Sequence, residues 1–504
     1  MDAETKHLPE DSDQLKALCL KLMGEVDWLK QDVEKLEAML RLLRHQQFAS
    51  GSESMNREAM KNLFPDYVSD DPDAEEEAEK KKITYERGPR KKKPFPDHLP
   101  REDVKVDIPD SEKKCSCGCQ DDLKEVTETV TEKLKVTPAT YTVVRYHRPV
   151  YSCKKCESMK AAPMPPHPLP KCSVTVESLA NIAVSKCLDG LPLYRQDEIF
   201  KRSGFELGRD KMARWMIKVG LALEPIFLQM HKILLCHDLI SMDETRLQVL
   251  KEKGRSATSK SWVIVQARGD PNRRAIVLYH YNPSRSSNVM NGLLTGFRGK
   301  LMTDGLAVYD SLCNATSSID QVGCWAHARR RFVDAQKSSK PNSRKGTLAS
   351  HAVIEIDKLY EIERKIKDFP DDAILAARQQ KARPIVEKLG EWLERKKNSV
   401  PKSSKVGNGI HYALGRWEKL IKYLDDPKVP LDNNFVENRI RPFAVGRRNW
   451  LFSDTPEGAY SSMTLYSLLV TAKINDINPV EYLTGALIGM AKGESPDLHL
   501  PLVN

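Results

Sequence analysis

Between residues 239 and 335 the chain alternates β-type and helical patterns in an order that restricts the fold. Three runs rich in β-branched and aromatic residues follow one another at hairpin spacing, at 239–250, 261–269 and 275–283. A helical pattern at 288–297 precedes a fourth β-type run at 300–310, and 321–335 has the pattern of a strand that leads into a helix. Hairpin-spaced strands followed by alternating helices and strands predict an α/β domain built on one sheet.

Two carboxylates stand at equivalent places in this pattern. The order of elements suits a ribonuclease-H-like α/β domain, in which the first and fourth strands lie side by side. Asp243 lies in the first strand, within SMDETR, and Asp304 ends the apolar part of the fourth, within MTDG. Neighbouring carboxylates repel and desolvate one another unless a cation neutralises them, and hard oxygen ligands suit Mg²⁺ or Mn²⁺. We therefore expect a metal site at the ends of these strands.

A third acid, Glu437, lies within LDNNFVENRIRPFAVGRRNWLF, residues 431–452. The Asp-Asn-Asn start is favourable for a helix N-cap, so we expect a helix that brings Glu437 over the strand ends. Two ions about 4 Å apart, held by three carboxylates, would support in-line displacement at phosphorus. Asp432 is the alternative third acid, although it fits an N-cap better. The alternative for the whole segment is a surface helix with ion pairs, which stabilise little.

The same segment is rich in arginine, a residue suited to DNA phosphates. Pro442 predicts an end or a bend of the helix, with GRRNW as a loop beyond it. Trp450 could stack on a flipped base, but a place in the core is the favoured interpretation. The arginines expected to contact phosphate are Arg439, Arg441, Arg447 and Arg448.

The N-terminal region, residues 1–50, carries apolar residues at alternating steps of four and three. This pattern predicts a coiled coil, and because one helix cannot bury such a stripe alone we expect a homo-oligomer. A helix packed on its own domain is the alternative. Residues 51–110 form a charged, proline-rich linker. The residues of the expected seam are Leu15, Leu22, Val26, Leu29, Val33, Leu36, Leu40 and Leu43.

Five of the 11 cysteines fall within residues 111–165, where β-type runs such as 140–151 predict a small hairpin domain. Cys153 and Cys156 have the spacing of a zinc knuckle, and thiolates favour Zn²⁺. Four ligands would stabilise a domain too small for a good core. A hairpin with free thiols is the alternative. Three cysteines compete for the other two positions: Cys115, Cys117 and Cys119.

Helical patterns flank the expected catalytic region. Residues 172–235 include a short helix, a turn at Gly204 and a helix that begins near Arg209, which together resemble a helix-turn-helix. A plain helical bundle explains the pattern equally well. The catalytic domain is expected at 236–455, with a helical insertion at about 340–425 and a helical region at 456–504. The basic residues of the expected recognition helix are Arg209, Lys211 and Arg214.

The overall composition agrees with a DNA-binding protein and excludes some other classes. The formal net charge is +10 and the pI is about 8.9, which is compatible with a polyanionic partner. No run of about 18 apolar residues is present, so no membrane span is expected. The polar N-terminus does not resemble a secretory signal, so we expect a cytoplasmic protein.

Several motifs together resemble the transposases of the insertion sequence 66 family of bacterial elements. In family order they are KKPFPDHLPRE, RYHRPVYSCKKC, LPLYRQDEIF, MDET, TDGLAVYD, CWAHARRRF, LDNNFVENRIRP, GRRNWLF and SLLVTAKINDINPVEYL. The resemblance implies that Asp243, Asp304 and Glu437 are the catalytic acids, working with Mg²⁺. It also implies binding to double-stranded DNA at element ends and target, companion proteins encoded by the same element, and a place on the bacterial nucleoid.

The resemblance adds a second motif and one departure. Cys324 and His327 match a Cys-x2-His motif of related transposases, which implies a histidine near the scissile phosphate; a structural histidine is the alternative. The first zinc knuckle reads Cys-x-Cys-x-Cys here, where many members have Cys-x2-Cys. The expected function is a DDE transposase. A catalytically silent regulator that binds zinc and DNA, and a nuclease that cuts without joining, are the alternatives.

Overall fold

The computed structural model describes residues 101–103, 131, 133, 140–154, 156–269, 274–338 and 346–502. By contacts the chain divides into two compact units, one of residues 1–50 and 164–504 and one of residues 51–163. The predicted coiled coil, most of the linker, and Cys115, Cys117 and Cys119 lie outside the described residues. Those predictions therefore remain predictions.

The described part of the smaller unit is a short antiparallel hairpin. Strands β1 (Val150–Ser152) and β2 (Met159–Ala161) pair in a register that sets Tyr151 opposite Lys160. The expectation of a strand throughout 140–151 was wrong, because residues 140–149 are irregular. Pro149 has no N–H to donate to a ladder, and an isolated two-stranded hairpin is only marginally stable.

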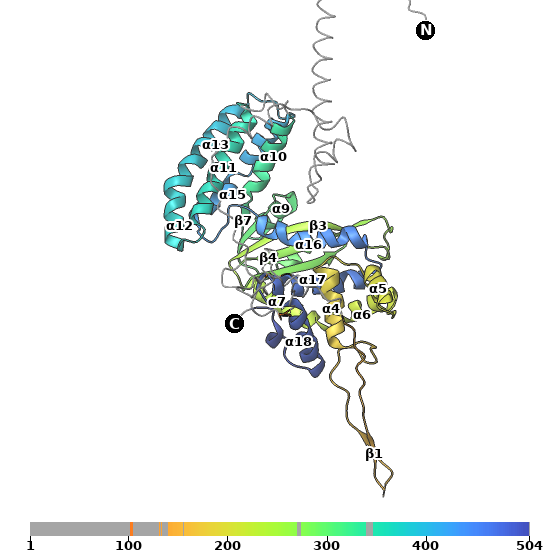
Figure 1. The fold of residues 1–504 in the computed structure, drawn as a ribbon. Helices are drawn as coiled ribbons and strands as arrows, with labels where there is room; N and C mark the ends of the chain where they lie inside the picture. The colour runs from red at the N-terminus through yellow and green to blue at the C-terminus, as the bar shows by residue number, and fades with distance from the viewer. Residues whose placement is uncertain are drawn as a thin grey trace, which may run out of the picture. The chain divides into compact units, whose positions relative to one another are not determined.

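A five-stranded sheet lies at the centre of the larger unit, in the order β5-β4-β3-β6-β7 (Figure 1). The first three strands are antiparallel neighbours, whereas β6 runs parallel to β3 and β7 runs parallel to β6. The predicted strands and the adjacency of the first and fourth are thus confirmed. Their bounds are β3 Leu239–Gln248, β4 Lys260–Arg268, β5 Ile276–Asn282, β6 Gly299–Thr303 and β7 Ile319–Gly323.

The fourth strand is shorter than the sequence pattern suggested. It ends at Thr303, and helix α9 (Ala307–Ala315) begins three residues after Asp304. Gly305 between them has a φ of 85°, a conformation that glycine adopts without the steric cost of a side chain. The chain therefore leaves the sheet directly beside Asp304.

Helix α17 (Pro456–Ile474) lies beside the edge strand β5, and its polar side chains form hydrogen bonds with the main chain of that strand. The main-chain N–H groups of Val277 and Tyr279 donate to Thr471 Oγ1 over 3.1 Å and to Ser467 Oγ over 2.8 Å. Asn475, just after the helix, continues the series. Four helical residues advance about 6 Å and two strand residues about 6.6 Å, so the two spacings match. The helix thereby protects an edge that would otherwise be open to pairing.

Helices cover the two faces of the sheet. On one face lies α16 (Asn434–Trp450), whose Phe443 ring lies 6.4 Å from that of Tyr279. On the other face lies α7 (Glu224–Leu235), whose His231 ring lies 5.1 Å from that of His280. Successive residues of β5 point to opposite faces, which agrees with these contacts. Helix α8 (Ser287–Leu293) covers the same face as α7, because Gln266 Nε2 donates to the Leu293 carbonyl over 3.2 Å.

The helices at 176–235, which precede the sheet, and those at 456–492, which follow it, share one hydrophobic core with the sheet. Gly220 of α6 packs so closely on α17 that a Cβ there would lie 2.5 Å from Ser461 Cβ. The helical patterns predicted in 172–235 are confirmed, and the C-terminal region is helical with an interruption between Ile474 and Pro479. Within the described residues, no helix combines the length and the apolar composition needed to cross a membrane. The bounds are α4 Val176–Cys187, α5 Leu193–Arg202, α6 Arg209–Ala222, α18 Pro479–Lys492 and η5 Pro496–His499.

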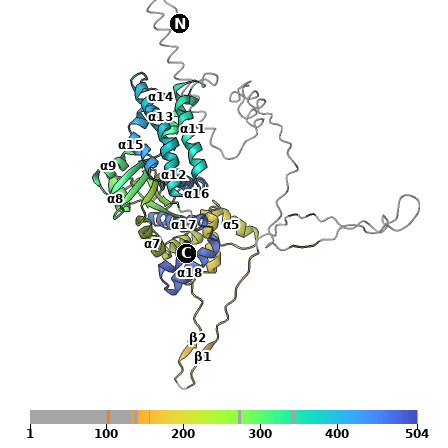
Figure 2. The same ribbon diagram turned by 90° about the vertical axis from the view of Figure 1, so that its left-hand side faces the viewer.

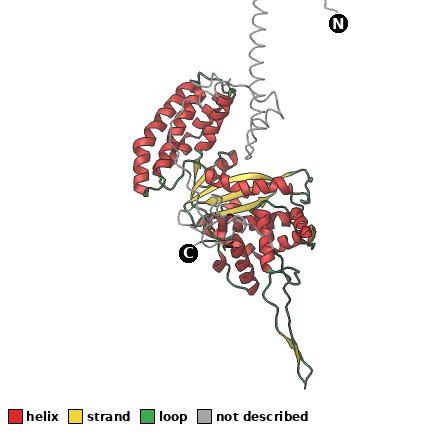
Figure 3. Ribbon diagram, in the orientation of Figure 1, coloured by secondary structure: helices red, strands yellow, loops and turns green. Residues whose placement is uncertain are grey.

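Helices occupy the described part of the region predicted as a helical insertion, as Figures 2 and 3 show. Their apolar side chains form a second hydrophobic core together with residues of β6, β7 and α10. Arg378 is buried in it, forms an ion pair with Glu363 over 2.7 Å and donates to the main chain at the end of the insertion. This arginine fixes the chain that returns to α16. Helix α10 (Trp325–Lys337) precedes the insertion. The elements of the insertion are α11 Leu348–Ile366, α12 Asp371–Ala377, the π-helical turn η3 Arg378–Ala382, α13 Arg383–Lys397, α14 Lys405–Leu414, α15 Trp417–Ile421 and η4 Lys422–Asp425.

Helix α16 is longer than the sequence predicted. It continues through Pro442 to Trp450, so GRRNW is helical and not a loop. An internal proline removes one helical hydrogen bond and costs about 3 kcal/mol. Tertiary packing offsets this cost, because Phe443 is fully buried and a Cβ on Gly446 would lie 2.5 Å from the Tyr466 hydroxyl.

Candidate active site

The pairing of β3 with β6 places the first two predicted acids, Asp243 and Asp304, opposite each other on neighbouring strands. Ile240 of β3 lies opposite Leu301 of β6, and Ser241 lies opposite Met302. Continuing this parallel register by two residues sets Asp243 opposite Asp304, just beyond the end of β6. Each carboxylate uses Oδ1 for a nearby main-chain N–H: Asp243 accepts from Glu244 over 2.8 Å and Asp304 from Leu306 over 3.0 Å.

The electrostatic environment shows that the three predicted acids are brought together. The pKa of Asp243 is raised to about 7, mainly because the carboxyl is buried. The negative charges of Glu244, Asp304 and Glu437 raise it further. A carboxyl with this pKa carries its proton about half of the time near neutral pH. A cation bound beside Asp243 would favour its ionised form and so oppose the effect of burial.

Glu437 reaches the site because the start of α16 is fastened to the sheet. Asn433, the fully buried N-cap residue, donates from Nδ2 to the Met242 carbonyl over 2.9 Å. Its main-chain N–H donates to Cys324 Sγ over 3.2 Å. Asp432, the alternative third acid, lies one residue before the cap and accepts from Asn434 N over 3.0 Å. Glu437 thus lies one turn into a helix that is anchored beside Asp243.

Two residues of α10 approach the carboxylate of Glu437. His327 Nδ1 lies 3.5 Å from Oε1, and Arg330 Nη2 donates to Oε2 over 3.0 Å. Burial lowers the pKa of His327, although the charge of Glu437 opposes that effect. Both His327 Nδ1 and Glu437 Oε1 are buried and make none of the hydrogen bonds found among the described residues.

The Cys-x2-His motif belongs to this same site. Cys324, the N-cap of α10, is buried, and burial raises the pKa of its thiol to about 12. The possible metal-ligand atoms of Cys324, His327 and Glu437 all lie within 4.8 Å of one another. The motif therefore brings its histidine to the third predicted acid, and the thiol accepts a hydrogen bond from the chain that leads into α16.

The ligand chemistry of the three predicted acids suits a hard divalent cation. Among the described residues, the group of possible ligand atoms that all lie within 4.8 Å of one another is Cys324, His327 and Glu437, so the three acids themselves are not that closely clustered. Oxygen atoms of Asp243, Asp304 and Glu437 are the ligand type that Mg²⁺ and Mn²⁺ prefer. Within the described part of the chain, Oδ2 of Asp243 and of Asp304 takes part in no hydrogen bond, and Glu437 Oε1 is a buried acceptor without a donor. A cation bound between them would satisfy these atoms and neutralise the charges that raise the pKa of Asp243.

A fourth acid, Glu244, was not singled out from the sequence. It follows Asp243 on the opposite face of the sheet, where its side chain is only 3% exposed. Arg285 Nη1 donates to it over 2.9 Å and the Tyr309 hydroxyl over 3.0 Å. Burial and the charge of Asp304 raise its pKa, and the tyrosine and arginine oppose this. The sequence shows Glu244 within MDET, but its partners Arg285 and Tyr309 lie far away in sequence, so no local pattern indicated this environment.

The arginines of α16 do not all face outward as predicted. Arg441 and Arg448 are exposed. Arg447 instead donates to Thr245 Oγ1 over 3.1 Å and joins α16 to β3. Arg439 is half-buried with its guanidinium 4.9 Å from the centre of the Phe435 ring. Because α16 continues through Pro442, its inner face turns these two side chains toward the sheet.

Trp450 lies partly buried against the main core, and its ring centroid is 5.6 Å from that of Phe443. Lys186 lies 5.5 Å from its centroid. These contacts agree with the favoured interpretation of Trp450 as a core residue.

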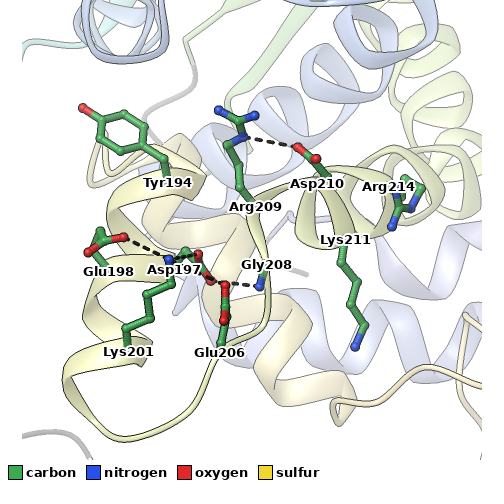
Figure 4. A pocket seen from close by; sticks show the side chains of 10 residues that line it. All are labelled: Tyr194, Asp197, Glu198, Lys201, Glu206, Gly208, Arg209, Asp210, Lys211 and Arg214. Carbon is green, nitrogen blue, oxygen red and sulfur yellow. Dashed lines mark hydrogen bonds and ion pairs between the residues drawn. The ribbon is translucent and has the colours of Figure 1, made fainter.

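Helices α5 and α6 frame an open depression of about 530 Å³, which is lined by none of the three predicted catalytic acids (Figure 4). The buried Asp197 accepts from Gly208 N over 2.8 Å at the start of α6 and pairs with Lys201 over 3.1 Å. The connection at 203–208 is longer than the usual turn of a helix-turn-helix. The three predicted basic residues, Arg209, Lys211 and Arg214, are exposed and line this depression.

The two described zinc candidates lie in the turn of the hairpin. Cys153 and Cys156 are exposed and free of disulfides. Hydrogen bonds from Ser158, assisted by Cys153, lower the pKa of Cys156 to about 7. Cys153 also fixes the turn, because Glu157 N donates to its carbonyl over 2.9 Å. A thiol that ionises near neutral pH is suited to bind Zn²⁺.

Comparison with protein families gives three matches along the chain. Residues 171–461 match the transposase IS66 family. Residues 112–157 match the zinc-finger binding domain of transposase IS66, which supports a structural zinc. Residues 35–104 match a domain described as transposase C of IS166 homeodomain. The matches support a DNA-binding transposase with a zinc-binding domain.

Three relatives from Sinorhizobium fredii (strain NBRC 101917 / NGR234) are similar over most of their length. Uncharacterized protein y4qI is 30% identical, covering 96% of this chain and 95% of the relative. Uncharacterized protein y4jD is 30% identical, covering 98% of this chain and 96% of the relative. Uncharacterized protein y4hP is 30% identical over 79% and 74%. With the family match across the sheet and its helices, these likenesses confirm the resemblance seen in the sequence: the chain belongs to the IS66 family of transposases.

Proposed function

We propose that this protein is a metal-dependent DDE transposase that cleaves the ends of an insertion sequence and joins them to target DNA. The observation that carries the proposal is the placement of Asp243, Asp304 and Glu437 around one region of the sheet. The β3–β6 register sets Asp243 opposite Asp304, and the hydrogen bond from Asn433 to the Met242 carbonyl fastens the start of α16 beside them. The strand order β5-β4-β3-β6-β7, with an antiparallel hairpin pair beside parallel strands, supports a ribonuclease-H-like core. The family match supports the class of reaction.

Asp243, Asp304 and Glu437 would hold Mg²⁺ or Mn²⁺. When bound, such ions activate an attacking oxygen and stabilise the leaving oxygen during displacement at phosphorus. His327 lies beside Glu437, with its buried Nδ1 3.5 Å from Oε1, and burial lowers the pKa of the ring. The exposed Arg441 and Arg448 provide positive charge on the outer side of the same helix.

The rest of the chain would bring DNA to this site. We place a zinc-binding domain at 111–165, a helix-turn-helix-like DNA-binding region at 172–235 and an oligomerising coiled coil within 1–50. The exposed Arg209, Lys211 and Arg214 on α6 would contact the DNA backbone. Removing residues 1–50 should lower the particle mass by more than the mass of the deleted residues, to fewer chains per particle, in size-exclusion chromatography with light scattering. An unchanged mass would exclude the coiled coil as the oligomerisation element.

The proposal is tested by Mg²⁺-dependent cleavage and strand transfer on labelled element-end DNA. Wild type should form both products, while Asp243→Asn, Asp304→Asn and Glu437→Gln should lose both by at least about 10³-fold, as expected when a reaction depends on bound metal. Asp432→Asn is the matched control, because Asp432 lies next to the site on the same segment. Cleavage without joining would indicate a nuclease. Undiminished cleavage by Glu437→Gln would contradict the assignment of the third acid.

A further inference from the structure

The helical insertion contacts the main chain that carries the second predicted acid. Tyr412 of α14 donates its hydroxyl proton to the Asp304 carbonyl over 2.7 Å. Arg416, just before α15, donates from Nη2 to the Gly305 carbonyl. Two side chains of the insertion thus bind two consecutive carbonyl groups at the end of β6, although more than 100 residues separate them in sequence.

The turn at Gly305 is shaped to receive Arg416. Gly305 has a positive φ of 85°, and a Cβ at this position would lie 2.1 Å from Arg416 Nε. Any larger residue would displace the guanidinium or the turn. Within the turn, Asp304 Oδ1 accepts from Leu306 N over 3.0 Å, so the carboxylate direction depends on the main-chain path. A shift of the carbonyls would therefore move the carboxylate.

The two side chains are themselves held in place. The Tyr412 ring lies between two guanidinium groups, with Arg331 4.1 Å and Arg416 4.7 Å from its centroid. Lys419 pairs with Asp310 of α9 over 2.6 Å and keeps α15 beside the helix that follows the turn. Burial raises the pKa of Tyr412 to about 12, so the hydroxyl keeps its proton and remains a donor at neutral pH.

The insertion does not need these contacts to remain attached. Trp325 Nε1 donates to the Leu420 carbonyl over 2.9 Å, and Leu420 packs directly on Gly323 of β7. Both contacts join the insertion to the sheet at β7 and the start of α10. Removal of the Tyr412 hydroxyl should therefore leave the insertion docked and alter only the turn at Asp304.

We infer that the helical insertion is a positioning element of the metal site, in which Tyr412 and Arg416 set the Asp304–Gly305 main chain and thereby the direction of the Asp304 carboxylate. The inference rests on the proposed function, because it takes Asp304 to be a metal ligand. Tyr412 and Arg416 touch neither metal nor DNA in this role. They act through Asp304.

The test measures the affinity of the full-length, zinc-loaded protein for Mn²⁺ by electron paramagnetic resonance, without DNA. Tyr412→Phe and Arg416→Gln should each weaken Mn²⁺ binding about three- to tenfold, the scale of one hydrogen bond. The melting temperature should stay close to that of wild type. Tyr423→Phe is the matched control, because among the described residues this buried hydroxyl of the insertion has no hydrogen-bond partner. It should bind Mn²⁺ as wild type does.

A double substitution separates positioning from an independent effect. Adding Tyr412→Phe to Asp304→Asn should cause no further loss of Mn²⁺ affinity, because both act through one ligand. Saturating Mn²⁺ should restore cleavage to Tyr412→Phe. If Asp304→Asn weakens Mn²⁺ binding but Tyr412→Phe and Arg416→Gln do not, the positioning role is refuted and the proposed function stands. If Asp304→Asn itself leaves Mn²⁺ binding unchanged, the proposed metal site fails, and the positioning role fails with it.

Discussion

Arg330 of α10 forms an ion pair with Glu437 of α16, with Nη2 3.0 Å from Oε2. The other carboxylate oxygen faces His327 Nδ1 at 3.5 Å. The Arg330 side chain is 55% exposed, so it can also turn toward solvent or a phosphate. A divalent cation at the candidate site must therefore compete with a guanidinium for the same carboxylate.

Replacing Arg330 by Gln should strengthen Mg²⁺ binding in the absence of DNA. An ion pair this exposed contributes roughly 0.2–1 kcal/mol, which corresponds to a gain of up to about fivefold in affinity. Isothermal titration with Mg²⁺ measures the change. Arg329→Gln is the control, since Arg329 pairs with Asp357 on the opposite side of α10. Weaker Mg²⁺ binding by Arg330→Gln would show that the arginine supports the metal site.

The zinc-binding domain should hold one Zn²⁺ per chain with two ligands from the described hairpin turn. Cys153→Ser and Cys156→Ser should each release the metal, because a structural zinc site needs all four ligands. Zinc content by mass spectrometry after dialysis is the measurement. Cys236→Ser, at an exposed cysteine of the larger unit, should keep its zinc.

The first knuckle can be resolved by the same measurement. Cys115, Cys117 and Cys119 compete for two positions, so two of the three serine variants should lose zinc and one should keep it. Retention of zinc by all three variants would mean that the cysteines substitute for one another or that the knuckle is not a ligand pair.

Thr471→Val should destabilise the protein although the two side chains have the same shape. Thr471 Oγ1 accepts from Val277 N and donates to the Val277 carbonyl, both over 3.1 Å. Valine would leave two buried main-chain groups unpaired, at about 1–3 kcal/mol each. Thr464→Val, equally buried on α17, loses only a 3.4 Å bond within the helix and should cost less. Urea unfolding compares them, and equal losses would argue against the edge-protecting role.

His280 should make the protein less stable as the pH falls. Burial lowers its pKa from 6.5 to about 3, so between these values the unfolded chain binds a proton that the folded chain does not. The free energy of unfolding should therefore rise with pH across this window and level off above it. His280→Leu should flatten the slope. Val277→Ala, on the same strand, should lower stability equally at every pH. An unchanged slope in His280→Leu would assign the acid sensitivity to other groups.

The strands of the sheet along the chain, and the helices before and after them, could be predicted from the sequence. These features follow from local patterns, because the spacing of apolar residues indicates the type of element. The pattern did not fix the strand ends, since β3 continues past Asp243 to Gln248 and β6 stops at Thr303. Asp243 and Asp304 could be paired from the sequence alone, since both stand where an apolar run stops. Family motifs extended the same inference to Glu437 and the zinc cysteines.

Which polar groups contact one another could not be predicted from local patterns and follows from how the elements pack. Pro442 lies inside a helix because packing of Phe443 offsets the lost hydrogen bond, and no local pattern shows that balance. Arg447 turns inward to Thr245, whereas the equally basic Arg448 stays exposed. Contacts such as Tyr412 with Asp304 join segments distant in sequence. Their partners are set by how helices pack on the sheet, and that packing depends on the whole core.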